Sequence, residues 1–211
     1  MKLHKNVALL LMLWGGMAAL PVSSRGQEQA PAPKPAPAPA PAPAAPVAPV
    51  ANAADVASPD AILGALYDVI SGPAGKRDWN RFRSLFLADA RLIPAGPLKP
   101  GTTSPRVLSP EGYAAVVTPY FEANGFFEKE VARRSERFGS VLHAFSTYES
   151  RHKADDATPF ARGINSIQLF FDGTRWWVVT VLWQQETPEV RLPKEFLPAG
   201  TEGVLAPAAS H

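Results

Sequence analysis

The sequence predicts an α+β domain in which helices come first and a bent antiparallel sheet follows. In the first half, apolar residues recur at helical spacing after Ser58-Pro59 and Ser109-Pro110, each of which combines an N-terminal cap with a first-turn proline. From Phe126 onward the apolar residues alternate with a period near two. The intervals between these later segments are too short for a crossover helix. We therefore expect about three helices and then a four-stranded meander.

The helices of the first half follow from their capping signals. Ser58 begins the first helix, Gly72-Pro73 ends it, and its apolar positions are Ile62, Leu63, Leu66, Val69 and Ile70. Asp78 begins a second, short helix that presents Trp79, Phe82, Leu85 and Phe86 on one side. An extended ARLIP segment and a loop rich in Gly, Pro and Thr lead to the third helix, which Pro119 should kink or split.

The meander has a predictable register. If Arg151 faces Phe160, then Glu149 lies opposite Arg162, and His143 lies opposite Gln168. Opposite charges across the ladder favour this pairing. If Phe171 faces Trp176 around the Asp172-Gly173 turn, the last two strands pair Gln168 with Val179, Ser166 with Val181 and Ile164 with Trp183.

This register gives the sheet two different faces. One face mixes apolar walls with convergent polar groups, as small-molecule sites do. Its candidate binding residues are His143, Glu149, Arg162, Ser166, Gln168, Trp177 and Trp183. The other face carries Leu142, Ala144, Ile167, Leu169, Phe171, Trp176, Val178 and Leu182, which is too much apolar surface to leave in water. Helices or a second subunit must cover it, and we expect Trp176 to contribute to an outer, dimer-forming face.

The order of elements resembles the nuclear transport factor 2-like superfamily, and within it the exported bacterial proteins of SnoaL-like or polyketide-cyclase-like type. The resemblance covers about residues 58 to 185, and its carriers are AILGALYDVISG, WNRFRSLFLADARLIP and GINSIQLFFDGTRWWVVTVLW. It implies a cone-shaped barrel in which helices close the concave side of the bent sheet around a pocket. It also implies a homodimer through the outer sheet face.

Function is not settled by this resemblance, because the fold hosts isomerases, dehydratases and cyclases as well as binding and scaffold proteins. The chain carries no aligned catalytic set, so we assign no catalytic residue, metal ligand or cofactor. We expect a pocket for a small apolar or anionic ligand, or for a partner, with Arg162 as the anchor for an anion. The alternatives are a lyase, isomerase or hydrolase in which His143 or Glu149 performs acid–base chemistry, and a structural dimer with a filled interior.

The N-terminal stretch predicts export. Lys2, His4 and Lys5 precede an apolar run that is shorter than the roughly 20 residues of a membrane span, which is typical of a signal peptide over residues 1–26. The chain has no cysteine, which excludes a lipid-modified cysteine anchor and disulfides. We expect a periplasmic or secreted protein with no integral span after cleavage, an Ala/Pro-rich disordered linker over 27–57, the domain over 58–198 and a disordered tail over 199–211.

The net charge is close to balanced, at +2 for 21 basic and 19 acidic residues. Basic residues cluster around Lys76-Arg77 and Arg133-Arg134, but acids are interspersed in the second group. We interpret both clusters as solvated faces, and we expect no nucleic-acid partner.

Overall fold

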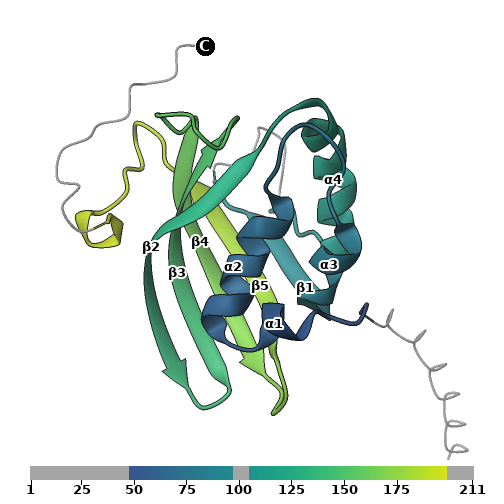
Figure 1. Ribbon diagram of the computed structural model, residues 1–211. Coiled ribbons are helices and arrows are strands. Elements are labelled where there is room, and N and C mark those ends of the chain that lie inside the picture. Colours follow the sequence, from purple (N-terminus) through teal and green to yellow (C-terminus); the bar gives the residue numbers. More distant parts are fainter. Residues whose placement is uncertain (1–47, 97–104, 199–211) are drawn as a thin grey trace, which may run out of the picture. The chain divides into compact units, whose positions relative to one another are not determined.

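The computed structural model describes residues 48–96 and 105–198, and these form a mixed sheet covered by helices (Figure 1). The predicted signal peptide, most of the predicted linker and the predicted tail lie outside the described residues. Within the described part of the chain, no helix is both long and apolar enough to span a membrane. Helix α1 (Ala53–Val56) falls inside the stretch predicted as linker, and Val56 is buried in the core.

The helices begin where the capping signals place them. Helix α2 (Pro59–Ile70) starts after Ser58, whose hydroxyl accepts a hydrogen bond from the Ala61 amide at 3.1 Å. Helix α3 (Trp79–Ser84) is capped in the same way by Asp78. Helix α4 (Pro110–Ala123) is capped by Ser109, and it runs through Pro119 as one helix rather than splitting there.

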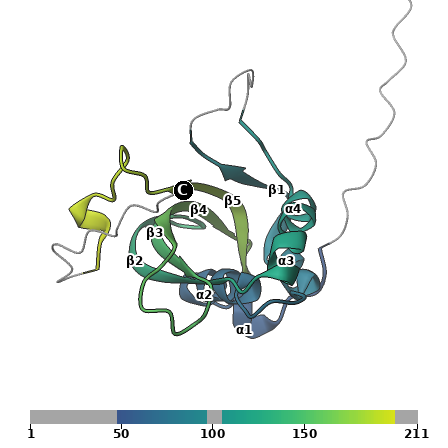
Figure 2. The same cartoon turned by 90° about the horizontal axis from the view of Figure 1, so that it is seen from above.

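The sheet contains the predicted meander and one further strand. Strands β2 (Phe127–Phe138), β3 (Val141–Arg151), β4 (Ala161–Phe171) and β5 (Trp176–Gln185) are antiparallel neighbours. The extended segment before the Gly/Pro-rich loop becomes β1 (Phe86–Pro94), which pairs with β5 in parallel. The order is β1-β5-β4-β3-β2, so the sheet is mixed and is not closed into a barrel. Seen from above, it is bent around α2, and α3 and α4 lie toward the β1 side (Figure 2).

The predicted register holds between β3 and β4, where Glu149 is paired with Arg162 and His143 with Gln168. Between β4 and β5 it holds only as far as Leu169, which is paired with Val178. Gln168 is then paired with Thr180 instead of Val179, because a β-bulge adds one residue to β5. The same shift pairs Ser166 with Leu182 and Ile164 with Gln184.

The bulge matters because one residue of shift turns every following side chain to the opposite face. Val181 and Trp183 consequently join the face that the helices cover, and Leu182 lies on the other face with 39% of its surface exposed.

The helices cover the face that we predicted to be the outer one. The buried core includes Leu142 and Ala144 of β3, Ile167 and Leu169 of β4, and Trp176 and Val178 of β5, together with the apolar side of α2. Trp176 is 3% exposed, so its predicted place on an outer, dimer-forming face is wrong. The physical reason is that the more continuous apolar face gains most from burial under the helices. We call this the helix-covered face, and the opposite side the outer face.

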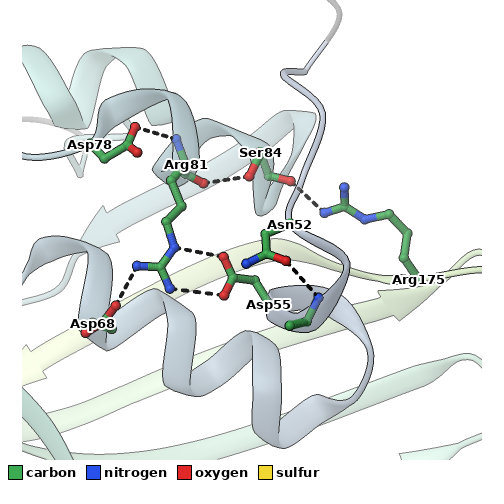
Figure 3. Close-up of polar contacts among 8 residues, drawn as sticks. Asn52, Asp55, Asp68, Asp78, Arg81, Ser84 and Arg175 are labelled. Carbon is green, nitrogen blue, oxygen red and sulfur yellow. Dashed lines mark hydrogen bonds and ion pairs between the residues drawn. The ribbon is translucent and has the colours of Figure 1, made fainter.

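One arginine joins the three N-terminal helices (Figure 3). Arg81 of α3 makes two hydrogen bonds to Asp55 of α1, at 2.8 and 3.0 Å, and a third to Asp68 of α2 at 2.5 Å. The hydrogen bonds from Arg81 hold the pKa of Asp55 below its usual value. Arg175, in the turn between β4 and β5, donates to the Ser84 carbonyl at the end of α3. This network has a structural role, because its polar groups are paired with one another.

Candidate functional site

A cavity of about 330 Å³ lies between the helix-covered face of the sheet and helices α2 and α4. Its volume is at the small end of the range for ligand pockets, roughly 300–1,000 Å³. Val116, Tyr120 and Phe160 are each 41–43% exposed, which places the mouth beside them. The wall is mostly aliphatic and aromatic, with polar groups supplied by Tyr67, Tyr113, Glu128, Tyr148, Ser150, Asn165 and Gln185.

Glu128 is the only charged residue that lines this cavity among the described residues. Its backbone is fixed by Ser71 at the end of α2, whose hydroxyl accepts from the Glu128 amide at 2.9 Å and donates to the Glu128 carbonyl at 3.1 Å. Its carboxylate accepts a hydrogen bond from Ser150, its cross-strand partner on β3, at 2.8 Å. The side chain is thereby held at the polar end of an apolar cavity.

Burial raises the pKa of Glu128 to about 7, although hydrogen bonds from Ser150 and Asn165 favour the ionised form. The reason is that a carboxylate loses hydration in an apolar site, and no cation among the described residues of the wall compensates for this loss. A carboxyl group with such a pKa exchanges its proton readily near neutral pH, as general acids and bases do.

A chain of hydrogen bonds fixes the side chains next to Glu128. Ser146 donates its hydroxyl proton to Glu130, so the Tyr67 hydroxyl, 2.6 Å from the Ser146 oxygen, donates to Ser146. The same Tyr67 oxygen accepts a hydrogen bond from the Asn165 amide at 3.0 Å. Glu130 is in turn paired with Arg133 at 3.1 Å. The donors all point toward Glu130, which keeps the amide nitrogen of Asn165 turned toward Tyr67.

Two other phenols are unengaged. Among the described residues, the hydroxyls of Tyr113 and Tyr148 have no hydrogen-bond partner in the protein, and both residues line the cavity. Burial raises the pKa of each above its usual value, and the charge of Glu128 adds to this, so both remain neutral donors near neutral pH. Tyr148 packs against Gly163, its cross-strand partner, where a Cβ atom would lie 2.6 Å from its hydroxyl. Glycine is needed there for this close approach.

Most of the predicted binding residues lie on the outer face and not in the cavity. His143 and Ser166 do come together, with 2.8 Å between His143 Nε2 and Ser166 Oγ, and the ring of Phe145 packs edge-on against His143. Gln168, the cross-strand neighbour of His143, is exposed. The interpretation of this face as the cavity wall is wrong, because its polar side chains meet solvent while the more apolar face lies under the helices.

Glu149 and Arg162 are neighbours across the ladder, but their ion pairs go elsewhere. Arg151 pairs with Glu149 at 2.7 Å, and Glu186 accepts from Arg162 at 2.6 Å. Glu149 and Arg162 border a cleft of about 30 Å³ beneath the C-terminal segment, which is space for about one water molecule. That segment packs on the outer face through Phe196.

The two predicted tryptophans separate. Trp177 lies on the outer face, where its indole N–H donates to Asp172 at 2.7 Å and the Arg175 guanidinium lies 3.7 Å from its ring centroid. Trp183 alone of the seven predicted residues lines the cavity, with its ring perpendicular to that of Tyr113 at 6.2 Å. Whether the six outer-face residues bind anything stays a prediction.

Comparison with known proteins finds matches among solved structures. No protein-family model and no curated protein sequence matches the chain. Solved structures of nuclear transport factor 2-like proteins do match it. A protein of that kind and of unknown function from Silicibacter pomeroyi is 12% identical with a TM-score of 0.42, covering 62% of this chain and 94% of that one. Another of unknown function from Methylobacillus flagellatus is 13% identical with a TM-score of 0.37, covering 62% and 95%.

The protein LinA also matches, at 12% identity with a TM-score of 0.47, covering 72% of this chain and 95% of that one. Solved structures of the superfamily that the sequence resembles are thus among those that match the chain. At these identities the likeness says nothing of function, which has to be inferred from the residues of this chain.

Metal binding has no support in the described part of the chain. No three His, Asp or Glu side chains there come together in a way that could hold a metal ion.

Proposed function

We propose that this domain binds a small, largely apolar molecule in the cavity under the helices, and that Glu128 is the polar anchor for it. The observation that supports this most directly is the carboxyl group of Glu128 in an aromatic and aliphatic cavity. It accepts a hydrogen bond from the neutral Ser150, and no other described residue of the wall is charged. Apolar walls fix the body of a ligand and a few placed polar groups fix its orientation.

The energetics agree with a binding role. Keeping a carboxyl group in an apolar site costs stability, and no described residue of the wall supplies a cation that offsets this cost. The unengaged hydroxyls of Tyr113 and Tyr148 likewise leave hydrogen-bonding capacity unused inside the protein. A ligand with acceptor atoms would pair with these hydroxyls in place of solvent.

The proposal is tested with full-length chain in which tryptophan is replaced by 5-fluorotryptophan. A panel of small aromatic and aliphatic molecules is titrated while the ¹⁹F resonance of Trp183 is followed, assigned through its loss in Trp183→Phe. We expect a saturable shift of Trp183 with some members of the panel, no shift of the outer-face Trp177, and no shift of Trp183 in an Ala161→Phe variant that fills the cavity. Shifts of Trp177 that equal those of Trp183, or no shift of either, would contradict cavity binding.

A second candidate function, an acid–base enzyme of isomerase or lyase type, is favoured by the pKa of Glu128, about 7. Ionised Glu128 would accept a proton from a carbon beside a carbonyl group, and the Tyr113 and Tyr148 hydroxyls would donate to the oxygen on which negative charge develops. His143 and Glu149, the acid–base residues expected from the sequence, lie on the outer face and are not part of this arrangement.

This second function is tested by proton exchange. Full-length chain is incubated in D₂O with small ketones, and deuterium uptake beside the carbonyl is followed by NMR. Catalysed uptake that rises with pH through about 7 and is lost in Glu128→Gln would support it. Uptake unchanged by Glu128→Gln would refute the role of Glu128, and binding without any uptake would leave the domain as a binding module.

Export remains part of the proposal. The basic residues and apolar run near the N-terminus, and the Ala/Pro-rich stretch after them, support secretion or periplasmic location with the linker as a tether. N-terminal sequencing of the mature protein tests this, since a chain that begins at Met1 would contradict cleavage.

A homodimer through the outer face also stays a prediction, to be tested by light scattering. Its surface would include Val141 and Phe170, which are 57% and 38% exposed.

A further inference from the structure

Nine aromatic side chains line the cavity that also contains Glu128: Tyr67, Phe82, Tyr113, Tyr120, Phe121, Phe126, Tyr148, Phe160 and Trp183. Their planes differ in direction. The rings of Tyr113 and Trp183 are perpendicular, and those of Phe121 and Phe126 are stacked at 4.9 Å. The negative faces of such rings attract a cation placed over them.

The cavity has negative charge and no positive charge to balance it. No Lys, Arg or His side chain lines it among the residues that the structure describes. One cation does approach the wall from outside: the Arg77 guanidinium lies 5.1 Å from the Phe121 ring centroid and is bonded to carbonyl groups of Ile70 and Gly72. An aromatic ring of this wall therefore already accepts a cation on one of its faces.

We propose that the ligand is an organic cation, a small amine or quaternary ammonium with an apolar body, held by the Glu128 carboxylate and the surrounding aromatic rings. This inference rests on the proposed function, that the cavity holds a small molecule. A cation supplies the counter-charge that Glu128 lacks, and the rings replace part of its hydration. An anion would meet like charge and no basic residue, and a neutral molecule would leave the ionised carboxylate unpaired. Arg162, the anchor expected for an anion, is engaged with Glu186 on the outer face.

Recognition of a cation depends on pH through Glu128. The phenols on neighbouring elements whose pKa values the Glu128 charge raises are Tyr67 of α2, Tyr113 of α4 and Tyr148 of β3. Glu128 also borders a second hollow, whose charged lining residues are Asp60, Asp68, Lys129, Glu130 and Arg151. Burial raises the pKa of all three phenols, so they stay neutral while Glu128 ionises. On β2 itself, Glu130 is paired with Arg133. Binding of a permanent cation is therefore expected to strengthen as pH rises through about 7, because only the ionised carboxylate attracts it.

The test uses benzyltrimethylammonium, which carries a fixed positive charge, and neopentylbenzene, its neutral carbon isostere. Each is titrated into full-length 5-fluorotryptophan chain at pH 5.5 and pH 8, with the Trp183 resonance as the reporter. With a Glu128 pKa of about 7, the ionised fraction and hence the affinity for the cation rise about 30-fold between these pH values. The isostere should show no such rise. Glu128→Gln should remove both the pH dependence and the preference for the cation, and Glu136→Gln, at an exposed position of the same strand, should keep both.

The outcomes separate the two proposals. A cation that binds more tightly than its isostere, with the preference lost in Glu128→Gln, supports the inference. Equal binding of the two probes, or tighter binding of the isostere, overturns the inference and leaves the binding cavity intact. If neither probe nor any other molecule shifts Trp183, the inference and the proposed function both fail. If Glu128→Gln does not fold, Phe126→Leu removes an aromatic ring of the wall and keeps the Trp183 reporter. It should lower the affinity for the cation more than that for the isostere, and the reverse ratio overturns the inference.

Discussion

Replacing Glu128 by glutamine should stabilise the fold at high pH and have little effect at low pH. The folded pKa of Glu128 is about 7 against an ordinary value of 4.5, so the folded state holds this proton more tightly than the unfolded state does. Between these two values the unfolding free energy falls as pH rises. Above pH 7 the full cost is present, at most about 3 kcal/mol for a shift of this size. Glutamine keeps the shape and an acceptor oxygen for Ser150 without the charge.

The measurement is urea unfolding of full-length wild type and Glu128→Gln at pH 5 and pH 8. The variant should gain about 2 to 3 kcal/mol relative to wild type between the two pH values, which raises the urea midpoint without changing the slope. Glu136→Gln, at an exposed site on the same strand, controls for the loss of one negative charge and should show no such gain. A difference between Glu128→Gln and wild type that is the same at both pH values, or that falls with pH, would refute the burial argument.

Two matched pairs of substitutions test the packing that supports the site, each by urea unfolding. Gly163→Ala places a Cβ atom 2.2 Å from a backbone oxygen of β5, so it should lower the unfolding free energy by about 1–3 kcal/mol. Gly64→Ala lies in open space within α2 and should raise it by about 0.5–1 kcal/mol. Equal effects would contradict the packing of Tyr148 on β4. Arg81→Met leaves the buried carboxylate of Asp55 unpaired and should lower the unfolding free energy by about 2 kcal/mol or more. Arg83 is equally exposed but pairs with an exposed acid, so Arg83→Met should lower it by under about 1 kcal/mol. Similar losses would argue against the Arg81 network.

The sequence predicts the elements well because their signals are local. Ser58, Asp78 and Ser109 each cap the helix that they precede. The Asp172-Gly173 turn and the pairing of Glu149 with Arg162 fix the meander, since turn chemistry and cross-strand charge act over a few residues. The extended ARLIP segment was predicted and lies in β1, but its parallel pairing was not, because its partner, β5, is about ninety residues away in the sequence and no local pattern encodes their pairing.

The sequence analysis did not predict the cavity around Glu128 for two reasons, one local and one that depends on the whole fold. The bulge at Val179 is local, but a run of Trp and Val residues carries no Gly or Pro to mark it. The choice of face is global, because it depends on which apolar surface the helices cover. A signal for the true site was present in the sequence: Glu128, Ser150 and Asn165 share the face of Ala144 and Ile167 in the observed register. In this chain, the polar residues that interrupt the more apolar face are the ones that line the cavity.

The cavity lies at one end of the sheet because the helix-covered face carries small residues there. Toward the β4–β5 turn, the helix-covered face carries Leu142, Leu169 and Trp176, which fill the space under the helices. Toward the other end it carries Ser150 and Gly163, which are too small to fill it. Glu128 therefore lies beside space that side chains do not fill, and removing its charge should not lower the unfolding free energy. A carboxyl group kept at a position where it destabilises the protein indicates a role in binding or chemistry, since stability alone would favour glutamine there.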